Sequence, residues 1–250
     1  IISQAQLYNS AVNSHEERVH NHMEDNFHLS NKKGMFYNLR DYCQAKGEDV
    51  FEVLPLTFHV EGITDSSFLS FQRYYENVSS KDSNNIWIIK PGEYTNRGCG
   101  ITVTSSLEEI KELVGEGGVH VNGKKKTFIL QKYIEKPFLY NKRKFDIRCY
   151  ILLTGINGVL KGYWYQDGYI RTSCKEYSLK NLANRMIHLT NDAVQKHDEN
   201  YGKFESANKI SFAELSKYID SNVEGRKRRW QNDIYPRIKV RLDLLMLAFG

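Results

Sequence analysis

Two segments in the first third of the chain repeat apolar residues at helical spacing. The apolar positions of the first segment are Met35, Leu39, Tyr42 and Cys43. It begins near Lys32, and the second covers 65–78, where the Asp65 side chain can accept hydrogen bonds from the first turn. Between the two predicted helices, residues 51–60 are interrupted by Pro55 and are predicted to form an extended connector.

Strand-forming patterns begin after the second predicted helix. The run 86–90 follows a polar stretch, is rich in β-branched and aromatic residues, and is predicted to be a buried strand. A glycine-containing loop, 91–100, leads to a return strand at 101–103. Residues 106–109, Ser-Leu-Glu-Glu, fit a capping box at the start of a helix, and 127–134 is predicted to be another strand.

Apolar and polar residues alternate in three further segments, which are 145–154, 159–165 and 169–172. Turn sequences at 156–158 and 166–168 separate them, so an antiparallel meander is predicted. The remainder is helix-prone, with apolar residues on one face over 234–245. Strands with helices on both sides predict an α+β fold. We assign 1–85 to an N-terminal flank and the start of a linker subdomain, and 86–250 to the core.

Composition limits the functions that this fold can have. The 250 residues carry 35 Lys+Arg against 30 Asp+Glu, a net charge of +5, and no nucleic-acid-binding signature accompanies this modest excess. The longest apolar stretches are far shorter than the roughly 18 residues of a membrane helix. The four cysteines have no CxxC spacing, so reduced thiols are expected rather than a zinc site or disulfides. A basic cluster at 226–229 suits an acidic polypeptide, or is a solvated helix start.

The first candidate site lies in the glycine-containing loop. Lys90 ends the strand before it, and the loop contains Asn96, Arg97, Gly98 and Gly100. Glycines let backbone amides approach a phosphate, and a lysine at the strand end can meet the same oxygen atoms. The spacing matches neither a P-loop nor a dinucleotide-binding fingerprint, and an ordinary hairpin loop is the alternative.

Two strands carry the next candidates. The segment that ends the strand 127–134 contains Gln131, Lys132, Tyr133 and Ile134. Its backbone groups can contact an adenine edge, and an amphipathic strand is the alternative. On the following strand, Lys144, Asp146 and Arg148 alternate and therefore share one face. That face suits a polyanion and a carboxylate, or it is a solvated face with paired charges.

Three later residues have related chemistry. Arg171 closes the strand 169–172, and an arginine can bind a carboxylate through two N–H groups. Thr190 and Asn191 follow a short helix-prone segment and can hold a phosphate oxygen or a metal-bound water.

Taken in order, these motifs resemble the tubulin-tyrosine ligase-like family, which has the ATP-grasp fold. The resemblance covers about residues 32–212, from the strand-end lysine and Arg-Gly-x-Gly through Lys-Phe-Asp-Ile-Arg and Ile-Arg-Thr to His-Leu-Thr-Asn. It implies an ATP-dependent ligase that joins an amino acid to a protein carboxylate through an acylphosphate, usually on the acidic tail of tubulin. It also implies ATP and Mg²⁺ as cofactors, with a free amino acid and microtubules as partners. The expected setting is the cytoplasm and cytoskeleton, cilia included, without membrane or nucleic acid.

The same resemblance implies roles for individual residues. The expected nucleotide-binding residues are Lys33, Lys90, Asn96, Arg97, Gly98, Gly100, Gln131, Lys132, Tyr133, Ile134, Lys144, Asp146, Thr190 and Asn191. Arg171 would bind the carboxylate of the incoming amino acid. Arg148 and Arg171 would stabilise the charge that develops during the transfer.

Two departures from the family pattern have consequences. Glutamate-adding members have a tyrosine after Thr-Asn, whereas this chain has Asp192. Its carboxylate would repel the side chain of a glutamate substrate, so glycine is favoured over glutamate or tyrosine. The family's late Asp and Glu-x-Asn magnesium ligands do not occur after Leu215. We therefore assign no metal ligands, and expect a fragment of a longer core or a chain that is inactive as it stands.

Functions of other classes stay open. A non-catalytic microtubule-binding relative would keep the same fold, and the late metal ligands would distinguish an enzyme from it. A kinase-like phosphotransferase is disfavoured because the chain has neither an HRD nor a DFG motif. A zinc enzyme is disfavoured because the histidines have no HExxH spacing.

Overall fold

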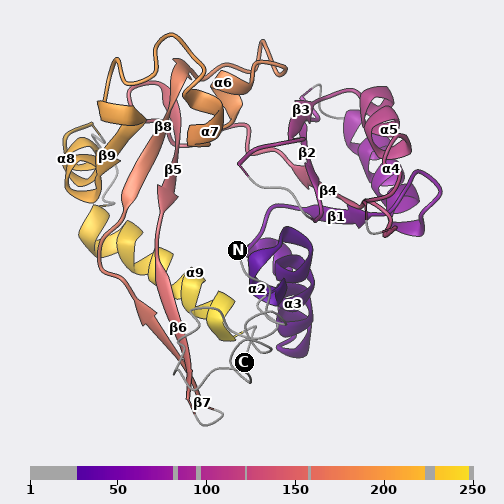
Figure 1. The fold of residues 1–250 in the computed structure, drawn as a ribbon, viewed down its shortest axis with the longest axis horizontal. Coiled ribbons are helices and arrows are strands. Elements are labelled where there is room, and N and C mark those ends of the chain that lie inside the picture. The colour runs from indigo at the N-terminus through magenta and orange to yellow at the C-terminus, as the bar shows by residue number, and fades with distance from the viewer. Residues whose placement is uncertain are drawn as a thin grey trace, which may run out of the picture.

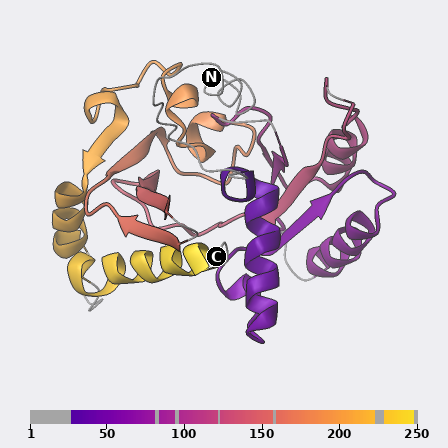
Figure 2. The same cartoon turned by 60° about the horizontal axis from the view of Figure 1, so that its bottom comes forward.

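The computed structural model describes residues 27–80, 84–93, 97–121, 123–156, 159–222 and 229–247. Two antiparallel sheets lie side by side, and helices cover the outer side of each (Figure 1). Helices α2 (Phe27–Ser30) and α3 (Lys32–Ala45) stand at the junction between the two halves (Figure 2). The α+β fold is therefore confirmed. No helix within the described residues is long and apolar enough to cross a membrane.

The first sheet has the strand order β1-β4-β2-β3. Its strands are β1 (Thr57–Val60), β2 (Trp87–Pro91), β3 (Thr102–Thr104) and β4 (Phe128–Lys132). Helices α4 (Ser66–Ser79) and α5 (Leu107–Gly115) cover one face, where Trp87 packs edge-on against Phe71 at 4.9 Å between ring centroids. Alternation leaves Lys90 and Gln131 on the opposite face.

Local signals account for the helix starts of this half. The Asp65 carboxylate accepts a hydrogen bond from the backbone N–H of Ser67, and the Ser106 hydroxyl accepts one from that of Glu109 at 3.2 Å. The Asp65 cap is thus confirmed, and so is the Ser106 half of the predicted capping box, whereas the Ser106 N–H donates to the Thr104 hydroxyl rather than to Glu109.

The predicted connector at 51–60 is more structured than its sequence indicated. It contains a 3-10 turn, Val50–Glu52, and then β1, which pairs with β4 along its whole length. A strand of four residues after Pro55 is too short to show a clear alternation, so its partner decides its structure. The first sheet draws strands from both sides of residue 86, and the proposed domain division stays a prediction.

The second sheet has the order β5-β8-β9. Its strands are β5 (Arg143–Arg148), β8 (Tyr169–Glu176) and β9 (Lys209–Ser211). The helical segments of this half are α6 (Arg185–His188), α7 (Asp192–Gln195), the 3-10 turn Ser206–Asn208, α8 (Phe212–Asn222), the π-helical turn Trp230–Ile234 and α9 (Tyr235–Leu247). Phe145 and Ile147 pack with Ile238 of α9 around the buried Ile170 and Trp230.

The predicted meander is wrong in its pairing. Strands β6 (Ile151–Ile156) and β7 (Val159–Trp164) form the expected hairpin, but they pair only with each other within the described residues. Strand β8 returns to lie beside β5 instead of β7. Alternation predicts a strand but not its neighbour, and the buried Ile170 fits the core beside β5. The β6–β7 ribbon leaves Leu152 and Tyr163 exposed and extends away from the sheet (Figure 1).

Candidate active site

An ion pair joins the facing strands of the second sheet. Asp146 on β5 lies opposite Arg171 on β8. The Arg171 Nε atom donates to Asp146 Oδ1 and Oδ2 at 3.1 and 3.0 Å, and an Arg171 terminal nitrogen lies 3.0 Å from Oδ1. The Thr190 hydroxyl also donates to Asp146 Oδ2. Three of the residues that the sequence singled out are thus in direct contact.

Lys144, two residues earlier on β5, points into the junction between the sheets. Its Nζ atom donates to the Tyr133 hydroxyl at 2.9 Å and to the backbone carbonyl of His188 at 3.1 Å. The Tyr133 hydroxyl is also 2.8 Å from His188 Nδ1. Burial and, to a smaller extent, the positive charge of Lys90 together lower the pKa of Lys144 to about 8, against the opposing effect of Asp146.

Lys90, on β2 of the first sheet, is the lysine whose charge acts on Lys144. Its Nζ atom donates to Gln131 Oε1 at 2.6 Å, and Gln131 Nε2 donates to the Thr57 hydroxyl at 2.8 Å. Burial lowers the pKa of Lys90 to about 8, and the charge of Lys32 adds to the effect. Three lysines from three separate elements therefore crowd one partly desolvated region. Such an arrangement is electrostatically unfavourable alone and fits a polyanion such as the triphosphate of ATP.

Lys32 and Lys33 differ in where their charges act. Burial lowers the pKa of Lys32, whereas Lys33 Nζ lies 3.4 Å from Glu93 Oε1 beside a groove of about 1090 Å³. The role predicted for Lys33 stays a prediction, and Lys32 is a residue that the sequence analysis missed. The sequence could have indicated this, because Lys32 lies on the same helix face as the buried residues Phe36, Leu39 and Cys43, at helical spacings of three and four.

The glycine-containing loop touches the second half of the molecule. Gly98 has φ +83°, and a Cβ atom there would lie 3.0 Å from Val194 Cγ2 and 3.1 Å from Asn191 Oδ1. An Arg185 terminal nitrogen donates to the Gly98 carbonyl at 2.7 Å. The loop is thus brought beside Asn191, while Asn96 lies outside the described residues. Gly100, at φ +66°, packs on Pro91 rather than on the second half.

The segment predicted to contact adenine has a mixed environment. Tyr133 is buried and its backbone N–H donates to the Ile86 carbonyl, whereas Ile134 is exposed. Lys132 Nζ donates to Glu135 at 2.7 Å. The adenine contact stays a prediction.

Asp192 begins α7, next to Asn191. Its Oδ1 atom accepts a hydrogen bond from the Tyr201 hydroxyl at 2.5 Å and lies 3.9 Å from Lys209 Nζ. This hydrogen bond raises the pKa of Tyr201 to about 12. The carboxylate is therefore held in place with one cation nearby, which reduces the repulsion that it would exert on a substrate.

The described residues do not by themselves fit Mg²⁺. They contain no group of three or more His, Cys, Asp or Glu side chains placed to hold a metal ion. Asp146 is the carboxylate whose charge acts on Lys144, and it is committed to Arg171 and Thr190. No step of the chemistry below is assigned to a metal.

Comparison with known proteins decides the family. The profile of the Tubulin-tyrosine ligase family matches residues 10–242, which is most of the chain. The chain belongs to the tubulin-tyrosine ligase family. Within it, the chain is 43% identical over 118 residues to "Tubulin glycylase 3B" of Drosophila melanogaster, covering 47% of this chain and 15% of that protein. It is 44% identical over 124 residues to human "Tubulin monoglycylase TTLL3", covering 49% and 15%.

A third relative in the tubulin-tyrosine ligase family covers more of the chain. "Probable tubulin polyglutamylase TTLL2" of Mus musculus is 32% identical over 188 residues, covering 70% of this chain and 31% of that protein. The chain thus spans less than a third of the length of each of these three relatives.

Proposed function

We propose that the protein is an ATP-dependent ligase that adds an amino acid, glycine in preference to glutamate or tyrosine, to side-chain carboxylates of tubulin. The observation that carries the proposal is a pair of desolvated lysines from two sheets in a member of this family. Lys90 Nζ donates to Gln131 and Lys144 Nζ donates to Tyr133, two residues further along the chain. Two desolvated ammonium groups in one region are stabilised by an anion of high charge beside them. ATP would meet that need and would supply the phosphoryl group that activates the acceptor carboxylate.

Lys32 completes the proposed phosphate site. Because its charge acts on Lys90, we assign it to the triphosphate ahead of the predicted Lys33, whose charge is paired with Glu93. Asn191 and Gly98, held against each other by the loop, would border the same site.

Arg171 is the proposed anchor for the incoming amino acid. Asp146 occupies its Nε atom and one terminal nitrogen, so the guanidinium plane is fixed while its remaining N–H groups stay available. Those groups can bind the carboxylate of a free amino acid. Arg148, two residues beyond Asp146 on β5, would face charge that develops on the acceptor.

The preference for glycine has two supports. The two glycylases match at 43 and 44% identity over about half of the chain, and the polyglutamylase matches at 32% over 70% of it. Asp192 also places a carboxylate next to Asn191, where the side chain of a glutamate substrate would be disfavoured.

The competing proposal is a non-catalytic relative that binds microtubules. It is favoured by one observation, that the described residues contain no carboxylate cluster for a metal. In that case ATP would not be consumed, although the group of three lysines would persist.

The test is amino-acid ligation by the full-length protein. Purified protein is incubated with tubulin, ATP and Mg²⁺, and with labelled glycine, glutamate or tyrosine in parallel. We expect incorporation of glycine. An Arg171→Lys variant keeps a cation beside Asp146 but loses the bidentate geometry, so ligation should fall at least a hundredfold while ATP affinity changes less than threefold.

Each alternative has its own outcome in this assay. Incorporation of glutamate without glycine would contradict the preference. Co-sedimentation with microtubules without incorporation of any amino acid would favour the non-catalytic relative. Unchanged ligation by Arg171→Lys would remove Arg171 from its assigned role.

A further inference from the structure

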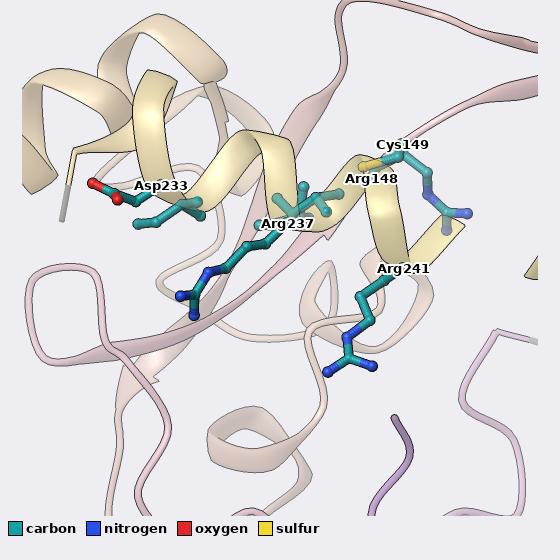
Figure 3. Close-up of a pocket in the computed structure, with 8 residues that line it drawn as sticks. Arg148, Cys149, Asp233, Arg237 and Arg241 are labelled. Atoms are coloured by element: carbon teal, nitrogen blue, oxygen red, sulfur yellow. The ribbon is translucent and has the colours of Figure 1, made fainter. Parts of the chain in front are cut away.

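Strand β5 packs against α9 on the face opposite to Lys144. Phe145 and Ile147 join the core on that side. A cavity of about 620 Å³ lies where the strand ends, and the residues of β5 and α9 that line it include Arg148, Cys149, Arg237 and Arg241 (Figure 3). The backbone of β5 is therefore fixed from the α9 side, and the position of the Lys144 ammonium group is set by the contacts on the other face.

The surroundings of His188 determine which of its ring nitrogens carries the proton. His188 Nε2 lies 2.9 Å from the backbone carbonyl oxygen of Asn181, which can only accept, so Nε2 carries a hydrogen. His188 is 2% exposed, and its burial, together with the charge of Lys144, lowers its pKa against the opposing effect of the Asn181 carbonyl. The ring is therefore neutral with its single N–H at Nε2, and Nδ1 is an acceptor.

Tyr133 connects this acceptor to Lys144. Burial raises the pKa of Tyr133, so its hydroxyl keeps its proton and donates it to His188 Nδ1, 2.8 Å away. The same hydroxyl oxygen accepts a hydrogen bond from Lys144 Nζ at 2.9 Å. Three hydrogen bonds therefore run in one direction, from Lys144 through Tyr133 and His188 to the carbonyl of Asn181, and each one fixes the orientation of the next.

His188 also holds Lys144 through its backbone. Its carbonyl oxygen accepts a hydrogen bond from Lys144 Nζ at 3.1 Å. An ammonium group has three N–H donors, so the Tyr133 hydroxyl and the His188 carbonyl direct two of them and thereby set the direction of the third. A lysine that is already oriented loses less conformational entropy when it binds a phosphate than a mobile one does.

We propose that the side chains of Tyr133 and His188 are positioning groups that direct the third N–H of Lys144 toward the phosphates of ATP. The proposal rests on the proposed ligase function and adds two side chains that act through Lys144. It gives the Tyr133 side chain a role separate from the adenine contact that is predicted for the backbone around it.

The test is a double-mutant cycle in the full-length protein, with the Kd of ATP and of adenosine measured by isothermal titration. Tyr133→Phe keeps the ring but removes the hydroxyl, and it should raise the Kd of ATP about fivefold while the Kd of adenosine stays within about twofold. Lys144→Ala should raise the Kd of ATP further. Adding Tyr133→Phe to Lys144→Ala should then have no additional effect, because the group that Tyr133 positions is absent.

Two further variants separate positioning from a loss of structure. His188→Asn keeps a hydrogen-bond acceptor near the place of Nδ1 and should bind ATP more tightly than His188→Leu, which has none. Tyr37→Phe is the matched control, because the Tyr37 hydroxyl lies 2.8 Å from His59 Nδ1 in an equivalent pair, whereas Lys144 donates to other groups. Tyr37→Phe should leave the affinities for ATP and adenosine unchanged.

The outcomes separate this proposal from the ligase function. An unchanged Kd of ATP in Tyr133→Phe, an equal loss of adenosine affinity, or a full additional loss in the Lys144→Ala background would overturn the positioning role while ligation by the wild type continues. Coupling between Tyr133 and Lys144 that requires the phosphates, in a protein that ligates no amino acid, would support the positioning role and contradict the ligase function.

Discussion

The buried positions of Lys90 and Lys144 indicate that this region binds an anion. A lysine normally stays in water, but each of these two donates to buried polar groups and has its pKa lowered to about 8 by burial. In the unfolded chain both would titrate near the ordinary value of about 10.4. Loss of their protons at high pH should therefore weaken nucleotide binding but increase the stability of the folded protein.

The pH dependence follows from these directions. The ammonium forms bind phosphate, so kcat/KM for ATP should fall as pH rises through about 8, by about tenfold per pH unit for each lysine lost. The nucleotide-free protein should instead become more stable between about pH 8 and 10, because the unfolded chain binds more protons there. Rate profiles and urea unfolding at each pH measure the two effects.

A variant separates Lys90 from other groups that titrate in this range. Lys90→Arg keeps its charge at high pH and should flatten the decline in kcat/KM, whereas Lys111→Arg on α5, across the sheet, should not. A decline that is identical in Lys90→Arg and wild type would show that this lysine does not govern ATP binding.

At the scale of elements, the loop between β2 and β3 depends on backbone conformation as much as on side chains. Gly98 adopts a left-handed conformation while lying against Val194 and Asn191. Gly47, after α3, has a similar φ of +71°, but a Cβ atom added there would meet nothing within 4 Å. A substitution at Gly47 therefore introduces only conformational strain, whereas one at Gly98 introduces both strain and a steric contact.

Replacing each glycine by alanine tests this difference. Both Gly98→Ala and Gly47→Ala should cost about 1 kcal/mol of stability from the left-handed conformation. Gly98→Ala alone should also weaken ATP binding several-fold, because the added methyl group pushes the loop away from Asn191. Urea unfolding and nucleotide titration provide the two readouts. Equal ATP affinity in both variants would contradict a phosphate-binding role for the loop.

Sequence patterns predicted individual elements of this fold better than their pairing. The helices after Asp65 and Ser106 and the strand ending in Lys90 follow local rules, which the structure confirms. The neighbour of β8 and the strand β1 depend on long-range packing, which no local pattern contains. Among the site residues, alternation predicted the shared face of Lys144, Asp146 and Arg148, whereas the contact of Asp146 with Arg171 depends on the pairing of β5 with β8. Which of Lys32 and Lys33 lies close to Lys90 depends on how α3 is rotated relative to the first sheet, and the sequence does not give this rotation.

On the scale of the whole molecule, α3 brings a charge from the N-terminal part of the chain to the junction of the two sheets (Figure 2). Its Lys32 acts on Lys90, while the adjacent Lys33 is paired with Glu93. The group of three lysines is thus assembled from segments more than a hundred residues apart, since Lys144 comes from β5.

Two neighbouring substitutions test this assembly. Lys32→Ala should raise the Kd for ATP about tenfold, because it removes a cation from the phosphate site. Lys33→Ala removes an equal charge that Glu93 already compensates and should change the Kd less than threefold. Isothermal titration with the full-length protein measures both. The reverse order of effects would support the role predicted for Lys33 from the sequence.

The β6–β7 ribbon has a practical consequence for handling the protein. Both of its outer edges are open within the described residues, and Leu152, Val159 and Tyr163 are more than half exposed. An open edge with apolar side chains is a template for intermolecular β-sheet pairing. Concentrated samples of the 250-residue chain should therefore self-associate through the ribbon. A charged residue in place of Leu152 should improve their solubility.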